Sequence, residues 1–267
     1  MRPEFVATLQ RIRQKAIFIP EEPKKKEKPP DGITCEFCGN TGWVEIKENG
    51  NVVMGHCPYC YEQRQAARRL RLSGIDPRDY ERYSLEAFDG NRSPMAQKMK
   101  SMAIRWLNQH EEKGPGFGLF GKSGMGKSHI CIGLCLKLTR NLKEPHYYFQ
   151  YRTEMPKLVK AAQSYSDDYA ETMKKWKELP NLYIDDLFKG SGKLRDGRLI
   201  DVDRNELQVV FDLVNARYLN HVTTIFSSEY SLQDITNVDE AIGSRIYEMT
   251  YPYIIQVTGE NQRLRRK

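Results

Sequence analysis

The stretch GFGLFGKSGMGKSHICIGLCLKLTR, residues 116–140, decides the fold because it joins a strand, a glycine-rich turn and a helix. The short apolar segment at residues 117–120 predicts a buried strand, and an apolar helix follows the turn. Between them, residues 121–128 have the G-x-x-x-x-G-K-S spacing of a P-loop. The sequence therefore predicts an α/β domain with a central parallel sheet that binds a nucleotide, taken to be ATP.

Each part of the P-loop has a chemical task. Glycines let the backbone turn its N–H groups toward phosphate oxygens, and the start of the helix adds partial positive charge. Lys127 is expected to reach the terminal phosphates and Ser128 to bind magnesium. Cys131 and Cys135, on the apolar face of the helix, are expected to be core residues. The predicted nucleotide contacts are Gly121, Gly124, Met125, Gly126, Lys127, Ser128 and His129.

Two later segments end in polar residues at what should be the same edge of the sheet. LPNLYIDDLF, residues 179–188, predicts a buried parallel strand that ends at Asp185 and Asp186. Asp185 is expected to hold Mg²⁺, directly or through water, and Asp186 to orient or deprotonate the attacking water. VTTIFSSEYS, residues 222–231, predicts another strand, with Ser228 and Glu229 at its tip near the γ-phosphate.

Four of the six cysteines are spaced for a metal. Cys35 and Cys38 form one Cys-x-x-Cys, Cys57 and Cys60 form a second, and eighteen residues separate the pairs. Residues 43–56 between them predict two short strands around an Asn-Gly turn, which would return the second pair to the first. Four thiolates form the tetrahedral set that zinc prefers, so a structural Zn²⁺ is expected. Buried or redox-active cysteines are the alternative.

The rest of the chain suggests how the protein is divided. We expect an N-terminal helix and a basic, proline-rich tether at 1–32, a zinc module at 33–73 and an ATPase domain at 74–267. The lysines at 24–26 either belong to a solvated linker or contact nucleic acid. The arginine-rich segment 61–75 predicts a helix that ends at Gly74. The net charge of +7 favours an anionic partner. The absence of a secretion signal and of a membrane-spanning stretch favours the cytoplasm.

The order of these motifs resembles a known family. The P-loop, the DD strand, TTIFSSE at 223–229, AIGSRIYEM at 241–249 and GENQRLRR at 259–266 look like the AAA+ ATPases that load replicative helicases. These are the DnaC and DnaI type, especially phage-borne relatives. The core is also similar to that of the IstB-type transposition helpers. Segments 83–92 and 211–220 and the cysteine-rich N-terminal module fit as well, so the resemblance spans roughly residues 33–267.

The resemblance implies roles for two arginines. Arg245 falls where the family places an arginine finger that reaches the ATP of a neighbouring subunit. A salt bridge on the helix surface is the alternative for this residue. Arg263 resembles the arginine that senses nucleotide within its own subunit. Many AAA+ proteins have asparagine at the polar strand tip, where this chain has serine, so the identity of the first sensor stays open. Many also have glutamate at the position of Asp186, and the shorter side chain here implies slow hydrolysis.

The basic segment at residues 187–205 suggests contact with DNA. It reads as a glycine-rich loop that either grips single-stranded DNA through phosphates or is simply solvated. The candidate DNA contacts are Lys189, Lys193, Arg195 and Arg198.

Together these patterns favour an ATPase that loads a hexameric replicative helicase onto single-stranded DNA and self-associates through its ATP sites. ATP would act as a switch for assembly and release, with turnover stimulated by the partner or by DNA. A transposition helper that binds duplex DNA with a transposase is the alternative, and a nucleotide-gated adaptor without hydrolysis is a third hypothesis.

Overall fold

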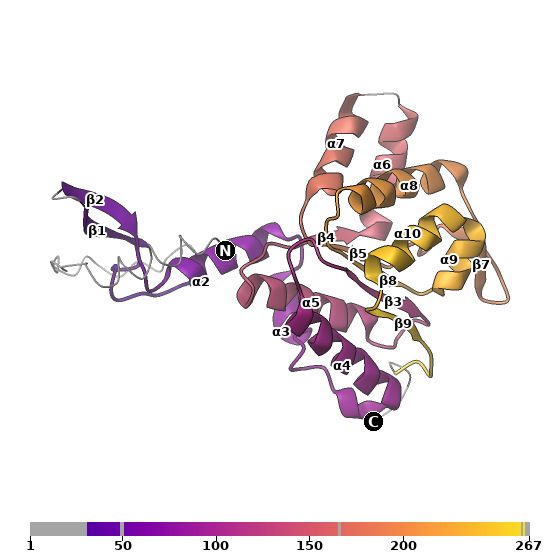
Figure 1. Cartoon of the computed structure of the whole chain (residues 1–267), viewed down its shortest axis with the longest axis horizontal. Coiled ribbons are helices and arrows are strands. Elements are labelled where there is room, and N and C mark those ends of the chain that lie inside the picture. Colours follow the sequence, from indigo (N-terminus) through magenta and orange to yellow (C-terminus); the bar gives the residue numbers. More distant parts are fainter. Residues whose placement is uncertain (1–30, 49–50, 165–166, 263, 265–267) are drawn as a thin grey trace. The chain divides into compact units, whose positions relative to one another are not determined.

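The computed structural model describes residues 31–48, 51–164, 167–262 and 264. The chain divides into two compact units between Leu72 and Ser73 (Figure 1), and each has its own core of buried side chains. The predicted N-terminal helix, the lysine-rich tether up to residue 30 and Arg263 lie outside the described residues.

The N-terminal unit is built around one hairpin and one helix. Its elements are β1 (Trp43–Glu48), β2 (Asn51–His56) and α2 (Tyr61–Leu72). The strands pair antiparallel with Trp43 opposite His56, which confirms the predicted hairpin. Its Asn49–Gly50 turn lies outside the described residues. The arginine-rich helix is also confirmed, and it is followed by Gly74, whose φ of 89° is a left-handed value that favours glycine.

The core of this N-terminal unit is small. Among residues 31–48 and 51–72, it consists of four buried residues, Ile33, Cys38, Cys57 and Cys60, with a few partly buried neighbours. The helix α2 contributes no fully buried residue. A core this small usually needs a cross-link or a metal to be stable. A metal held by the four cysteines would therefore stabilise the described part of this unit.

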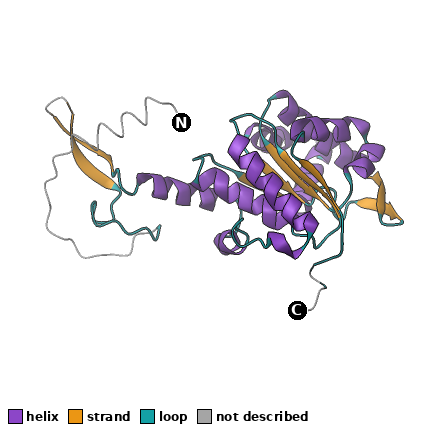
Figure 2. Cartoon of the chain, turned by 60° about the horizontal axis from the view of Figure 1, so that its bottom comes forward, coloured by secondary structure: helices purple, strands orange, loops and turns teal. Residues whose placement is uncertain are grey.

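The C-terminal unit contains a five-stranded sheet. Its strands are β3 (Phe117–Gly121), β4 (Tyr147–Gln150), β5 (Leu182–Asp185), β8 (Thr224–Ser228) and β9 (Ile254–Val257). They lie in the order β4-β5-β8-β3-β9, and all neighbours are parallel. Every residue of β3, β5 and β8 is buried, and helices cover both faces of the sheet (Figure 2). The predicted central parallel sheet is confirmed.

Helices surround this sheet. They are α3 (Pro77–Arg82), η1 (Gly90–Arg92), α4 (Pro94–Gln109), α5 (Lys127–Arg140), α6 (Tyr151–Gln163), α7 (Asp167–Glu178), α8 (Arg204–Leu219), α9 (Leu232–Val238) and α10 (Glu240–Thr250). Helix α5 packs against β5 and β8, and α8 packs against α6, α7 and α10. The side chains of Ser93, Asp203 and Asp239 accept backbone N–H groups and so fix where α4, α8 and α10 begin. Within the described ranges, no helix is both long and apolar enough to cross a membrane.

The segment 187–205 is not the loop that the sequence predicts. It contains a second antiparallel hairpin, formed by β6 (Gly192–Arg195) and β7 (Arg198–Val202). Asp196 and Gly197 between the strands have φ values of 52° and 76°, which suit a two-residue hairpin turn. Leu199 and Val202 are buried and join the hairpin to the main core. The Asp-Gly pair was the signal in the sequence for this turn.

A buried histidine joins the first helices of the C-terminal unit to β4. His146 is fully buried, with Tyr80 on its Nε2 at 2.7 Å and Thr139 on its Nδ1 at 2.8 Å. Burial lowers the pKa of His146 to about 3. The folded protein therefore keeps this ring neutral at pH values where the unfolded chain binds a proton.

This difference predicts acid sensitivity. Since the pKa of His146 is lowered from 6.5 to about 3 on folding, its contribution to stability is present above pH 6.5 and is lost as the pH falls toward 3. Between pH 7.5 and pH 5 the loss should be about 2 kcal/mol. Urea unfolding of the wild type and of His146→Gln at both pH values measures it. The free energy of unfolding should fall less in the variant, and equal falls would contradict the assignment.

Candidate nucleotide site and cysteine cluster

The predicted P-loop forms a tight turn at the carboxyl end of β3. Gly121, Gly124 and Gly126 have φ values of 133°, 77° and 89°, which side chains disfavour. A Cβ atom on Gly121 would lie 2.0 Å from the carbonyl oxygen of Val257, and one on Gly124 would lie 1.9 Å from Oδ1 of Asn261. The backbone can therefore follow this path only with glycine at these positions.

Lys127 begins α5 and points into the turn. It is buried, and its Nζ donates to the carbonyl oxygens of Gly121 at 2.7 Å and Lys122 at 2.9 Å. Burial lowers the pKa of Lys127, while the negative charges of Asp186 and Glu229 oppose that effect. The ammonium thus lies inside the loop, with acidic groups within electrostatic reach.

Ser128 and Asp185 meet across the site. Ser128 Oγ donates to Asp185 Oδ1 at 3.1 Å, although the two residues come from α5 and from the end of β5. The parallel strands bring them together because their carboxyl ends lie at one edge of the sheet. A hydroxyl and a carboxylate oxygen are the hard donors that Mg²⁺ takes from proteins, and it usually keeps several waters. The pair therefore fits the predicted magnesium site.

Three further hydroxyl groups surround Asp185. Ser227 Oγ donates to Oδ1 at 2.7 Å, Tyr183 also donates to Oδ1, and Tyr148 donates to Oδ2 at 2.7 Å. Burial and the charge of Asp185 raise the pKa of both tyrosines, so they act as neutral donors. The sequence did not single out Tyr148, because only the pairing of β4 with β5 places it beside Tyr183.

Asp186 lies beside two of the other predicted residues. Its Oδ2 is 2.7 Å from Lys189 Nζ, which is also 3.7 Å from Glu229 Oε2. Ser228, the other predicted sensor, is buried and donates through Oγ to the carbonyl oxygen of Leu187 at 2.8 Å. The structure thus brings Glu229 toward Asp186, while the Ser228 hydroxyl holds the loop that follows β5.

The segment before the P-loop packs directly on it. Arg92 donates to the carbonyl oxygen of Met125 at 2.9 Å and lies over the ring of Phe88. The predicted nucleotide residue His129 directs Nε2 to the carbonyl oxygen of Ser84 at 2.9 Å. The side chain of His129 therefore anchors residues 83–92 to α5, which sequence reasoning did not anticipate.

The four cysteines of the N-terminal unit converge. Their sulfur atoms all lie within 4.8 Å of one another, with Cys35 and Cys57 3.8 Å apart and Cys38 and Cys60 3.7 Å apart. A tetrahedron of sulfurs around zinc has edges of about 3.8 Å, whereas a disulfide requires about 2.05 Å. The thiols are free. The donor set therefore fits a closed tetrahedral metal site.

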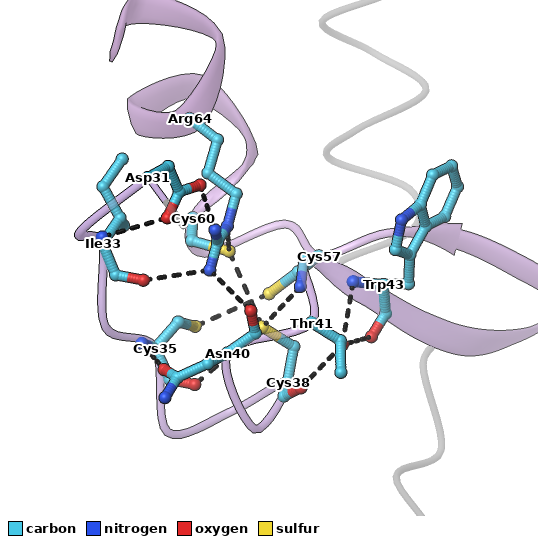
Figure 3. A network of polar contacts seen from close by, with 11 residues as sticks. Asp31, Ile33, Cys35, Cys38, Asn40, Thr41, Trp43, Cys57, Cys60 and Arg64 are labelled. Atoms are coloured by element: carbon cyan, nitrogen blue, oxygen red, sulfur yellow. Dashed lines mark hydrogen bonds and ion pairs between the residues drawn. The ribbon is translucent and has the colours of Figure 1, made fainter. Parts of the chain in front are cut away.

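Arg64 of α2 faces this cluster and not the solvent (Figure 3). Its Nε donates to Cys60 Sγ at 3.2 Å, and its Nη2 donates to the carbonyl oxygens of Ile33 at 3.0 Å and Asn40 at 3.1 Å. It also forms an ion pair with Asp31. One side chain thus joins α2 to the first cysteine turn and places positive charge beside the sulfurs, a role that the sequence did not predict for any arginine of this helix.

Comparison with known proteins tests these interpretations. No protein-family model matches the chain. A curated relative, the phage-like element PBSX protein XkdC of Bacillus subtilis, is 27% identical over 245 residues, which cover 88% of this chain and 86% of XkdC.

Two solved structures share the architecture of the C-terminal unit. The crystal structure of the DnaC helicase loader matches with a TM-score of 0.55 at 20% identity, and the match covers 68% of this chain and 100% of the DnaC chain. The crystal structure of DnaI matches with a TM-score of 0.55 at 21% identity, and the match covers 73% of this chain and 99% of the DnaI chain. The C-terminal unit has the AAA+ fold of the helicase loaders. The predicted fold class is therefore confirmed.

Within the AAA+ domain, Arg245 lies on α10 and is half-buried. Its Nε donates to Asn215 Oδ1 at 2.9 Å and its Nη1 to the carbonyl oxygen of Ala241 at 2.9 Å. The guanidinium also lies over the rings of Phe211 and Tyr218. These contacts within one chain hold the side chain at α8 and α10, and the surface salt bridge considered as an alternative is not among them.

The candidate DNA residues of the AAA+ domain separate into two places. Lys193, Arg195 and Arg198 are exposed on the β6–β7 hairpin, with Lys193 Nζ 2.8 Å from Asp201 Oδ2. Lys189 lies instead beside Asp186. Of the four predicted basic residues, three are therefore exposed on the hairpin, and Lys189 is paired with an acid of the candidate nucleotide site.

The contacts of Arg64 predict that it stabilises the metal site. Residues that contact metal ligands commonly contribute about 10- to 100-fold in affinity, so Arg64→Ala should weaken Zn²⁺ binding by that factor. Competition with a chromophoric chelator measures the affinity. Arg68→Ala, which changes an exposed arginine of the same helix, is the matched control and should behave as the wild type. Equal affinities for all three proteins would contradict this role.

Proposed function

We propose that the protein is an ATP-dependent loader of a replicative DNA helicase onto single-stranded DNA, with ATP as the switch for assembly and release. The observation that carries the proposal is the convergence of Ser128 and Asp185 beside Lys127, on the AAA+ fold shared with DnaC and DnaI. The similarity to a protein of a phage-like element supports a phage-type loader.

In this proposal the AAA+ domain hydrolyses ATP to ADP and phosphate. The glycine turn and Lys127 bind the phosphates, and Ser128 and Asp185 hold Mg²⁺. The ion would supply charge neutralisation of the phosphates. Asp186 orients or deprotonates the attacking water, and its short side chain suits slow turnover. Arg263 is proposed to sense the nucleotide within its own subunit.

The N-terminal unit is proposed to bind Zn²⁺ and to dock on the helicase. The closed set of four cysteines leaves no ligand position for catalysis, so the ion would be structural. Trp43, Val52, Met54 and Tyr59 are large apolar side chains that are between 48% and 65% exposed, and a contiguous group of such side chains can mark a binding surface. We propose that this surface contacts a hexameric helicase. In this proposal the chain has three parts with separate roles: the N-terminal segment 1–32, the docking module 33–73 and the ATPase domain 74–267.

Two further contacts complete the proposal. Arg245 would reach the ATP of a neighbouring subunit, so that self-association completes each site. The exposed residues Lys193, Arg195 and Arg198 of the β6–β7 hairpin would contact DNA phosphates. Both proposals require an assembled complex, in which the active site and the DNA lie between subunits.

Co-purification with a candidate hexameric helicase tests the function. The wild type should bind the helicase in an ATP-dependent manner. Lys127→Ala should weaken nucleotide binding by about 100-fold, because a charge-assisted contact is lost, and should remove this ATP dependence. Lys157→Ala, an exposed change on α6, is the control. Binding of every candidate helicase equally well with and without ATP would contradict the switch.

Arg245 can be tested by mixing two inactive variants. Arg245→Ala should bind ATP normally but turn it over about 100-fold more slowly in assembled complexes. Lys127→Ala has no working site but keeps its arginine. If the arginine acts on the neighbouring subunit, an equal mixture should recover about a quarter of the wild-type activity, because a quarter of the interfaces pair the intact groups. No recovery would contradict action between subunits.

A further inference from the structure

Lys189 occupies an unexpected place in the hydrolytic site. It follows β5, and its ammonium lies 2.7 Å from Asp186 Oδ2 and 3.7 Å from Glu229 Oε2. The two acids come from the ends of β5 and β8, which are neighbours in the sheet. Lys189 is therefore a cationic bridge between the carboxylate proposed to activate water and the carboxylate at the neighbouring strand tip.

The backbone around Lys189 is held firmly. Leu187 N donates to the carbonyl oxygen of Ser227 at 2.8 Å, and Ser228 Oγ donates to the carbonyl oxygen of Leu187 at 2.8 Å. Phe188 is fully buried although its φ is 63°, an unfavourable value for a bulky residue. Strained backbone of this kind persists where the surroundings determine it and is common at functional sites. The position of Lys189 is thus imposed by the fold.

The bridge acts electrostatically on the phosphate loop. The pKa of Lys127 is lowered mainly by burial, while the charges of Asp186 and Glu229 raise it and that of Lys189 lowers it further. All three groups are therefore within electrostatic reach of the lysine that would hold the terminal phosphates.

An ordinary surface ion pair has different features. Lys157 and Glu154 on α6 have the same three-residue spacing and a separation of 2.8 Å, but the Lys157 side chain is 63% exposed. The side chain of Lys189 is only 27% exposed and has two acidic partners. Pairing with both acids also leaves Lys189 poorly suited to the DNA contact expected from the sequence.

We propose that Lys189 is a positioning residue for ATP hydrolysis, which holds the Asp186 carboxylate through Oδ2 and is itself anchored by Glu229. The other oxygen, Oδ1, then accepts the proton of the attacking water. The water oxygen forms a bond to the γ-phosphorus while the bond from that phosphorus to the β–γ bridging oxygen breaks, and ADP leaves with that electron pair. This inference rests on the proposed ATPase function and adds a residue to it.

The test separates turnover from nucleotide binding. In Lys189→Met, kcat should fall by about 10- to 100-fold, because a misplaced base loses much of the benefit of general base catalysis. The KM for ATP and the affinity for a non-hydrolysable analogue should change by less than about threefold, since the phosphate contacts of the loop are intact. Lys189→Arg should recover most of the activity. Lys157→Met is the matched control and should have the wild-type kcat.

A double variant tests whether Lys189 acts through Asp186. Asp186→Asn alone should be slow, and adding Lys189→Met should slow it by less than about twofold, because residues that act as a unit have non-additive effects. A wild-type kcat in Lys189→Met overturns the proposal, as does a parallel loss of nucleotide affinity. If Lys189→Met loses DNA binding but keeps the wild-type kcat, Lys189 contacts DNA and the proposal is wrong. If the wild type does not hydrolyse ATP at all, the proposed ATPase function is wrong. If the wild type and Lys189→Met hydrolyse ATP equally fast, only the role of Lys189 is wrong.

Discussion

The hydrogen bond from Ser128 to Asp185 is the contact on which the rest of the candidate site depends. It joins the first turn of α5 to the end of β5, two elements that are far apart in the chain. Parallel strands make such a contact possible, because all their carboxyl ends lie at one edge of the sheet. The same edge receives Lys127 from the start of α5 and Ser227 from β8. Three separate segments, α5, β5 and β8, therefore contribute to one polar centre.

Burial makes this centre specific. Asp185 is almost entirely buried and is surrounded by four hydroxyl donors, from Ser128, Tyr148, Tyr183 and Ser227. An ionised carboxylate without such partners would be costly to bury. The tyrosines thus have a physical role that goes beyond filling the core. They hold the carboxylate in one orientation, as the proposed binding of a metal ion and a triphosphate requires.

The two units differ in how much buried apolar surface is available to stabilise them. The C-terminal unit has a large apolar core between sheet and helices, whereas the described part of the N-terminal unit has a four-residue core that includes three cysteines. A metal bound by four thiolates would supply the missing free energy, since metal binding and folding are coupled in small domains. Arg64 supports this arrangement because one side chain contacts Cys60, two carbonyl oxygens and Asp31.

The sequence by itself determined the P-loop, the acids that end β5, the four-cysteine set and the hairpin between its pairs. These features depend on residue type and short spacing, which act locally. Only the tertiary structure decided that Tyr148 binds Asp185, that Lys189 bridges Asp186 and Glu229 and that Arg64 turns toward the sulfurs. Most of these contacts join residues whose neighbourhood depends on strand order and helix packing, and no local pattern encodes which strand lies beside which.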